Sequence, residues 1–337
     1  MADELEELVQ FLADDRPEVK QMSVDIVKGL TGSQEGIDKL STKAELLLPM
    51  LLRLTNDGAP AVSLAACTSL VNLSQEQAVV HKLLGLRVVD RVMDYMREET
   101  CPHTRELMML ITNISQLEEG ARAVMQRGKG NLEGLHIARL MGMFMAPVDE
   151  SKGGDKMEYL ANVLTNLTRT IDGRRMVLEP GRGLVAALAK QLSPGCSTVR
   201  RVGCANTLRN CFYTCRADGT LGAILEAKAS LPLIMRPISG EEPKESEDQV
   251  REALSEAVLM LAAENEGREA LLEFDAHMVL KKGYELEEHP AVCEAMERTA
   301  VIFMTKGEVE PEDGAESTQP ADNEINVQVI PGGFSLA

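Results

Sequence analysis

The apolar positions of this chain recur in six similar segments, which align when one residue of each segment is taken as a reference. The positions directly after the reference, two places before it and eleven places after it are apolar in all six segments. The segments follow one another at intervals of 41 to 53 residues, the range of helical repeats that cover each other's apolar faces. The reference residues are Gly29, Asn72, Asn113, Asn166, Asn210 and Met260.

Each segment shows a long helical pattern around its reference residue. Proline or small polar residues open this pattern, at Pro17, at Pro60, within 101–104, at Ser197 and at Asp248. Four segments carry a glycine seven places after the reference, which we interpret as the left-handed residue that ends the helix. These glycines are Gly36, Gly120, Gly173 and Gly267.

A second amphipathic helix is visible later in most segments. Its apolar residues recur at helical spacing in stretches that begin at Glu45, Arg87, Leu132, Gly183 and Ala276. The two helical patterns and the repeat together predict an all-α, curved armadillo/HEAT-like solenoid of about six to seven repeats. We expect this solenoid to occupy residues 1–306.

Three segments depart from the repeat. The polar stretches 146–156 and 239–248 are expected to be exposed insertions, and the second, which is charged, is expected to be mobile. From Lys306 onward the chain holds one lysine against seven acidic residues, a net charge of −6. We therefore expect residues 307–337 to be a disordered acidic tail.

Composition narrows the class of protein. Hydrophobic residues make up 44% of the chain but aromatic residues only 3%, with no Trp, so the core must consist of Leu, Val, Ala and Met. The seven cysteines include no C-x-x-C pair, which indicates reduced thiols and a cytoplasmic protein rather than a zinc site. We find no basic leader at the N-terminus and no apolar run of about 18 residues, so no membrane association is expected.

Charge is unevenly distributed. The net charge is −18, yet residues 161–216 contain nine Arg and Lys against Asp172 and Glu179, a local charge of +7. We interpret this basic island as a candidate docking field for an acidic partner. The alternative is that its side chains are solvated or cap helix ends. The arginines chosen as partner-binding candidates are Arg169, Arg174, Arg175, Arg200, Arg201 and Arg209.

Polar side chains fall on the same helix face as two reference asparagines. Positions seven and four places before the reference and three places after it share its face of a helix. We expect these groups to line a groove that holds an extended partner; the alternative is that the asparagines hydrogen-bond neighbouring repeats and fix their stacking, which applies equally to Asn72 and Asn113. The groove candidates are Tyr159, Asn162, Asn166, Asn206, Asn210 and Tyr213.

No catalytic or cofactor motif is present. We find neither a phosphate-binding G-x-x-x-x-G-K-[ST] loop nor a G-x-S-x-G or H-E-x-x-H motif. The five histidines are dispersed, so neither a metal site nor any other cofactor is expected. Three N-x-[ST] sequences begin at Asn72, Asn113 and Asn166; because they recur with the repeat in helices, we interpret them as part of the repeat and not as glycosylation sites.

Three stretches resemble one family of armadillo proteins in particular. They are MEYLANVLTNLTRTIDGRRMVL (157–178), VRRVGCANTLRNCFY (199–213) and the segment 250–303 with its EGRE string. The chain thereby resembles the HGH-type armadillo family. This resemblance implies an ATP-independent chaperone adaptor that binds translation elongation factor two during its folding and helps deliver it to the cytosolic chaperonin, together with Hsp90-system cochaperones.

A second function remains open on the sequence alone. Other armadillo proteins are scaffolds or transport adaptors that bind an extended peptide or a nucleoprotein. An isoelectric point near 4.8 and the scarcity of aromatic residues for base stacking argue against nucleic acid as the partner.

Overall fold

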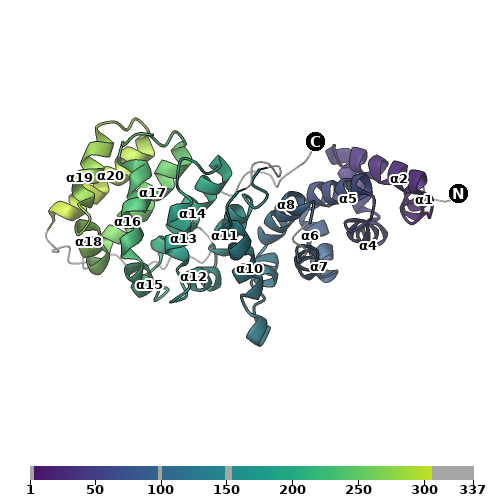
Figure 1. Cartoon of the computed structure of the whole chain (residues 1–337), viewed down its shortest axis with the longest axis horizontal. Coiled ribbons are helices and arrows are strands. Elements are labelled where there is room, and N and C mark those ends of the chain that lie inside the picture. Colours follow the sequence, from purple (N-terminus) through teal and green to yellow (C-terminus); the bar gives the residue numbers. More distant parts are fainter. Residues whose placement is uncertain (1–3, 98–100, 149–153, 306–337) are drawn as a thin grey trace, which may run out of the picture. The chain divides into compact units, whose positions relative to one another are not determined.

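The computed structural model describes residues 4–97, 101–148 and 154–305, and every regular element in these ranges is a helix. The described residues form two compact units, one up to Leu160 and one from Ala161 to Thr305 (Figure 1). The boundary between them lies at the start of α11 (Leu160–Leu167).

The N-terminal unit is a stack of three-helix repeats behind one leading helix, α1 (Glu4–Phe11). The long first helices pack side by side, α2 against α5 and α5 against α8, while α4 lies against α5 (Figure 1). The three repeats are α2 (Pro17–Leu30), α3 (Gln34–Ser41) and α4 (Ala44–Leu54); α5 (Pro60–Leu73), α6 (Gln77–Gly85) and α7 (Val88–Tyr95); and α8 (Thr104–Ser115), α9 (Glu118–Val124) and α10 (Leu135–Phe144).

The C-terminal unit repeats the same order of helices and ends on a long one. Its first helices again form one layer, with α14 against α17 and α17 against α20. The repeats are α11 (Leu160–Leu167), α12 (Ile171–Val177) and α13 (Leu184–Lys190); α14 (Thr198–Tyr213), α15 (Leu221–Glu226) and α16 (Leu231–Met235); and α17 (Asp248–Ala263), α18 (Asn265–Leu272) and α19 (Ala276–Tyr284), followed by α20 (Pro290–Met304). The six three-helix repeats confirm the predicted all-α, armadillo-like solenoid.

The predicted helix starts are confirmed. Pro17 and Pro60 occupy the first turn of α2 and α5, where a missing N–H costs no helical hydrogen bond. Ser197 caps α14 by accepting a hydrogen bond from the Arg200 backbone N–H at 3.3 Å. The proline and capping signals therefore locate the first helix of a repeat correctly.

The interpretation of the four repeat glycines as helix ends was wrong. Gly36, Gly120, Gly173 and Gly267 lie inside the short helices α3, α9, α12 and α18, and none has a positive φ. A Cβ at Gly173 would lie 2.0 Å from the Leu167 carbonyl oxygen, and the other three glycines meet the end of the preceding helix in the same way. Glycine is needed there because the short helix approaches the last carbonyls of the long helix too closely for a side chain.

Residues 241–244 of the insertion 239–248 are exposed as expected, but the side chain that follows them is anchored to the solenoid. Glu245 is buried, and its carboxylate receives two hydrogen bonds from Arg201, at 2.7 and 3.1 Å. Its carbonyl oxygen accepts a third from Arg251 at 3.0 Å. In the insertion 146–156, residues 146–148 are exposed as expected. Residues 149–153 and the predicted acidic tail lie outside the described residues.

The core has the predicted composition. Leucine, valine and alanine dominate the buried positions, and methionines such as Met108 and Met141 fill the space between them. All seven cysteines are free thiols, and burial raises the pKa of Cys211 to about 12. Among the described helices, none is both long and apolar enough to cross a membrane.

Candidate functional site

The reference asparagines connect neighbouring repeats. The Asn72 amide donates to Thr31 Oγ1 at 3.1 Å, and the Asn113 amide donates to Ser74 Oγ at 2.9 Å. In the C-terminal unit the Asn210 amide donates to Thr168 Oγ1 at 3.2 Å and to the Thr165 carbonyl at 3.3 Å. For Asn72, Asn113 and Asn210 the structure therefore favours the alternative interpretation, in which the asparagine fixes repeat stacking.

The acceptors of these bonds explain the recurring N-x-[ST] sequences. Ser74 and Thr168 each stand two places after a reference asparagine, and each receives the amide of the next repeat. Donor and acceptor are lost together further along the chain, where Phe212 stands at the hydroxyl position and Met260 replaces the next asparagine. The N-x-[ST] pattern thus supplies the donor and the acceptor of a hydrogen bond between neighbouring repeats.

Three of the six candidate arginines are buried and engaged inside the C-terminal unit. Arg174 forms a two-pronged ion pair with Asp218, at 2.5 and 3.2 Å, and both side chains are less than a tenth exposed. Arg200 donates to the Gln191 side chain at 2.6 Å. Arg201 pairs with Glu245 in the same two-pronged geometry as Arg174.

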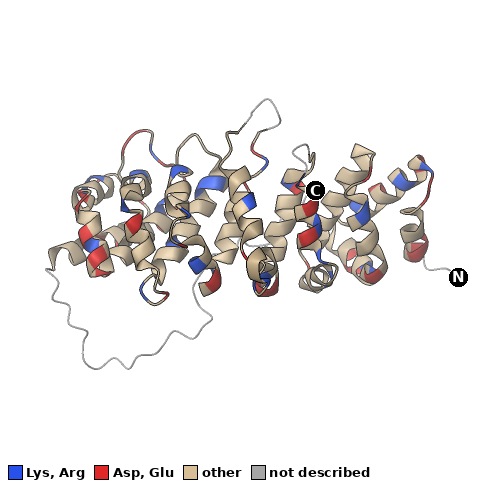
Figure 2. Ribbon diagram, turned by 60° about the horizontal axis from the view of Figure 1, so that its bottom comes forward, with Lys and Arg blue, Asp and Glu red and all other residues tan. Residues whose placement is uncertain are grey.

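Cations of the basic island form ion pairs with acidic residues of the next repeat along the chain. Arg209 pairs with Glu256 at 3.2 Å, and Arg216 donates to Glu266 at 2.7 Å. Because these acids follow residue 216, a count that stops at residue 216 includes the cations and omits their partners. Red and blue segments accordingly lie on neighbouring helices of this unit (Figure 2).

Besides the paired Arg209, which is partly exposed, four candidates remain at least partly exposed. Arg169 and Arg175 are exposed, Tyr213 is 52% exposed, and Asn166 is partly exposed. Arg175 also donates to the Asp218 carbonyl at 3.1 Å, which orients its guanidinium. These four residues reach the surface of the C-terminal unit.

The other groove candidates are buried. Asn162 and Asn206 are 5% and 9% exposed. Tyr159 belongs to the N-terminal unit, where its ring lies under the Arg105 guanidinium at 5.5 Å and its hydroxyl accepts from the same group at 3.3 Å. Whether any of the twelve candidates contacts a partner stays a prediction.

Within the described part of the chain, two consecutive residues of α14 each have a buried polar atom without a hydrogen bond. Arg209 Nη2 and Asn210 Oδ1 are both buried and have no hydrogen-bond partner among the described residues. An orphaned donor and an orphaned acceptor on consecutive residues of α14 are costly unless a water or a ligand supplies the missing bonds. They lie one turn before the exposed Tyr213 on the same helix.

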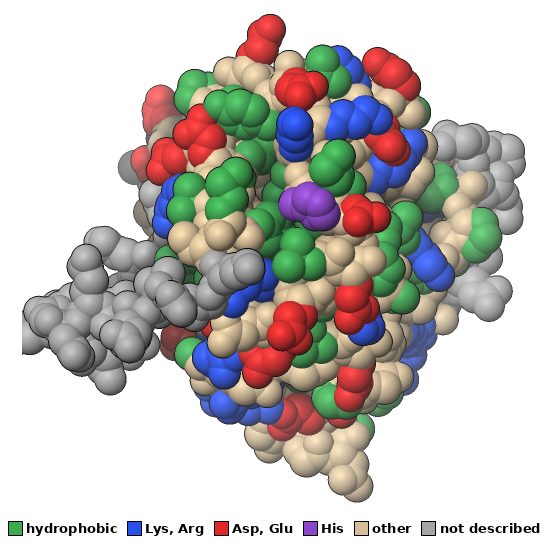
Figure 3. Space-filling model, turned by 90° about the vertical axis from the view of Figure 1, so that its left-hand side faces the viewer, with side chains coloured by type: hydrophobic (Ala, Val, Ile, Leu, Met, Phe, Trp, Pro, Cys, Tyr) green, Lys and Arg blue, Asp and Glu red, His purple; other side chains and the backbone are tan. Residues whose placement is uncertain are grey.

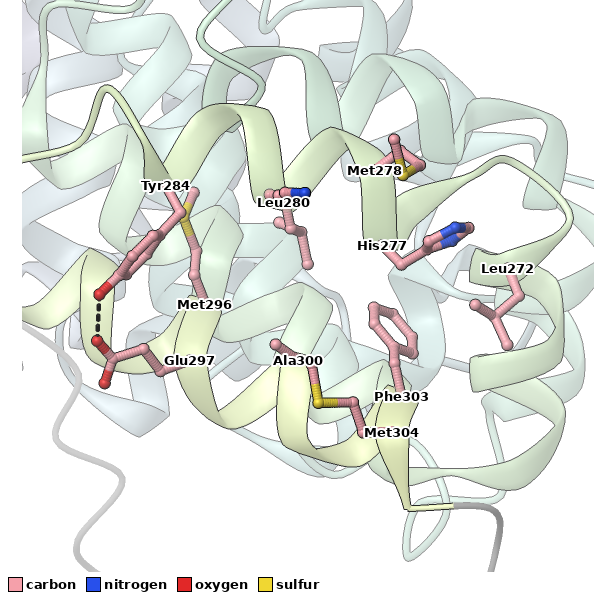
Figure 4. Close-up of a pocket in the computed structure, with 11 residues that line it drawn as sticks. Leu272, His277, Met278, Leu280, Tyr284, Met296, Glu297, Ala300, Phe303 and Met304 are labelled. Atoms are coloured by element: carbon pink, nitrogen blue, oxygen red, sulfur yellow. Dashed lines mark hydrogen bonds between the residues drawn. The ribbon is translucent and has the colours of Figure 1, made fainter.

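A second surface, which the sequence analysis missed, lies where the C-terminal unit ends. Helices α19 and α20 enclose an open groove of about 660 Å³, and Leu272 of α18 closes one side. Hydrophobic side chains gather around a single histidine on this face of the molecule (Figure 3). The sequence does contain a signal for this groove: residues 290–304 have an apolar face, and no further apolar repeat follows them to cover it. The lining side chains include Met278, Leu280, Tyr284, Met296, Phe303 and Met304 (Figure 4).

A serine and a histidine of the N-terminal unit lie in contact, but their surroundings are those of packed core residues. Ser63 Oγ and His103 Nε2 are 2.8 Å apart, both residues are buried, and the Ser63 hydroxyl also donates to the Pro60 carbonyl. Burial lowers the pKa of His103, in keeping with a neutral packing residue. No group of three or more His, Cys, Asp and Glu side chains in the described ranges is arranged to hold a metal ion.

Comparison with known proteins identifies relatives along nearly the whole chain. Proteins named "Protein HGH1 homolog" are 29% identical in Xenopus tropicalis, covering 94% of this chain and 93% of that protein, and 28% identical in Mus musculus, covering 92% and 84%. Among solved structures, a designed armadillo repeat protein aligns with 89% of this chain and 99% of its own at 15% identity and a TM-score of 0.46.

A family profile provides the assignment. The family described as "Domain of unknown function (DUF383)" matches residues 95–272, which is more than half of the chain and includes the asparagine and arginine contacts of α11 to α17. The chain belongs to this family, of which the HGH1-type armadillo proteins are the relatives found.

Proposed function

We propose that this chain is a non-catalytic, cytosolic adaptor that binds translation elongation factor two while that protein folds and helps deliver it to the cytosolic chaperonin. Support comes from membership in the HGH1-type family and from a scaffold whose polar contacts join its own repeats. Hsp90-system cochaperones are the further partners that the resemblance implies. Neither a membrane nor a nucleic acid has a place in this proposal.

The observation that carries the proposal is the exposed part of the basic island. Arg169 and Arg175 are exposed in the C-terminal unit, and Tyr213 adds an exposed aromatic side chain. Tyrosine and arginine are the residues that most often dominate the binding energy of protein interfaces. An acidic surface of the client is the chemistry that these groups would meet.

A direct test measures binding of the purified chain to elongation factor two, both native and during dilution from denaturant. We expect binding to the refolding client, with an affinity that falls as salt concentration rises. The double variant Arg169→Glu/Arg175→Glu should weaken binding by at least about tenfold, because opposed like charges cost more than 1.4 kcal/mol across an interface.

The matched control reverses two exposed charges in the N-terminal unit, Lys28→Glu/Arg53→Glu. It changes the net charge by the same amount and should leave client binding within about twofold of the parent. Equal loss in both double variants would mean that net charge alone acts. No binding to the elongation factor, together with capture of an RNA that nuclease removes, would replace the proposal with the nucleoprotein alternative.

A further inference from the structure

The groove between α19 and α20 is the place that the next repeat would cover. Within the C-terminal unit, α18 follows α17 and packs against both α17 and α15, and its Leu271 is fully buried. The same relation applied to α20 would place a following segment against α20 and α18. Among the described residues no helix follows α20, so the groove is open there.

The residues that line the groove occupy positions that are covered in the preceding repeat. When α17 and α20 are aligned from their first residues, Met296 is equivalent to Leu254 and Phe303 is equivalent to Leu261. Leu261 is fully buried, with Gly267 of α18 close to its side chain, whereas Phe303 remains partly exposed and Met304 is 80% exposed. Met278 of α19, 56% exposed, faces the same groove (Figure 4). These are core positions without a covering layer.

The sequence directly after α20 cannot supply that layer as α18 does. Eleven places after the reference every earlier repeat is apolar, but the corresponding residue after α20 is Asp313. Residues 306–324 contain seven acidic residues and only Val309 as a large apolar one. The next apolar cluster comes later, at Ile325, Val327, Val329, Ile330, Phe334 and Leu336.

We propose that residues 325–337 of the same chain occupy the groove between α19 and α20. The chain leaves α20 at Met304, on the wall of the groove itself, so the segment is held near its site. A flexible connection the length of 306–324 has an end-to-end distance of roughly 25 Å, which keeps the apolar cluster within reach. Attachment by such a connection gives an effective concentration on the order of 1 mM, so weak apolar contacts are enough for occupancy.

The charges at the groove fit an acidic connection. Lys281 lines the groove, is exposed and has no ion pair within 4–305, whereas Glu297 on the opposite wall is engaged by the Tyr284 hydroxyl. An acidic stretch that leaves the groove past Lys281 gains a counter-ion there. The last residues would then be a covering segment, in contrast to the expectation of disorder throughout 307–337.

The absence of tryptophan from this chain permits a site-specific test. Phe303→Trp introduces a single reporter in the groove, and Met304→Trp provides a second one at an exposed position that tolerates the change. We expect deletion of 325–337 to shift the emission of either reporter to longer wavelength and to raise its acrylamide quenching constant roughly twofold, because the indole loses an apolar cover. A synthetic peptide of residues 325–337 should reverse both changes.

Matched variants separate docking from a general effect of the tail. Ile330→Ser/Phe334→Ser should reproduce the deletion, whereas Val309→Ser in the connection should not. A Tyr213→Trp reporter on α14, outside the groove, should respond to none of these changes. Circular dichroism and thermal unfolding establish that each variant is folded.

Two results would overturn the proposal. Identical emission and quenching of both groove reporters with and without 325–337 would show that the segment lies elsewhere. An emission that depends on protein concentration, with a change in sedimentation, would show that a second copy of the chain covers the groove instead. Neither result bears on client binding through Arg169 and Arg175, which is measured separately.

Discussion

Arg174 and Asp218, like Arg201 and Glu245, stand 44 residues apart in the sequence and form buried two-pronged pairs in the structure. At the scale of single residues, the arginines of one repeat thus form ion pairs with carboxylates of the next. Desolvation makes such pairs poor sources of net stability, but removal of one partner leaves a buried, uncompensated charge. Their role is to fix how consecutive repeats are placed on each other.

The Arg201–Glu245 pair can be tested by removing one or both charges. Glu245→Ala should destabilise the folded chain by about 3 kcal/mol, because the Arg201 guanidinium stays buried without a counter-ion. The double variant Arg201→Met/Glu245→Leu should lose much less, since neither charge remains. Urea unfolding followed by circular dichroism measures both free energies.

An exposed pair provides the control for that experiment. Lys39 and Glu35 form an i,i+4 pair whose side chains are 60% and 78% exposed, so Glu35→Ala should cost far less stability than Glu245→Ala. If Glu245→Ala costs no more than Glu35→Ala, the Arg201 side chain is able to reach solvent and the buried pair does not constrain the repeats.

At the scale of helices, the spacing within each repeat depends on how closely the short helix meets the end of the long one. The four repeat glycines allow that approach, and each would place a Cβ at 1.9 to 2.2 Å from a backbone oxygen. Such a contact requires the backbone to move, since a carbonyl oxygen cannot turn aside as a flexible side chain can.

Gly173→Ala should therefore destabilise the C-terminal unit by about 2 kcal/mol or more, because overpacking forces a shift of α12 against the end of α11. Gly142→Ala in α10 is the matched control, since no atom lies within 4 Å of the added methyl group. There alanine should be neutral or stabilising by about 0.5–1 kcal/mol. Thermal unfolding of both variants checks this; a neutral Gly173→Ala would contradict the close approach.

At the scale of the whole molecule, stability is expected to vary along the chain, because each repeat contacts only its neighbours. Among the described residues, α14 lies between α17 and α11, which it meets through the Asn210–Thr165 hydrogen bond, whereas the contacts of α1 are with α2 and α4. Backbone amides of α14 should exchange with deuterium at least about tenfold more slowly than those of α1, a pattern typical of local opening at the ends of repeat arrays. Uniform protection in hydrogen exchange would instead indicate a single cooperative unit.

The sequence alone was sufficient for the class of fold, the repeat and the starts of most helices. These features depend on local signals: the apolar period, a proline at Pro17 or Pro60, and a cap at Ser197. The family followed from short strings in the same way. A local pattern can be read along the chain because the residues that make it are neighbours in sequence.

The tertiary structure decided what the polar residues do. The sequence cannot tell whether Arg201 and Asn210 face a partner or a neighbouring repeat. Only the contact of Arg201 with Glu245 and that of Asn210 with Thr168 show that both face a neighbouring repeat. Gly173 likewise reads as a helix end until its distance from Leu167 is known. Ion pairing, close approach and burial each join residues that lie far apart in the chain, so their outcome depends on how the repeats stack and not on the order of residues within one repeat.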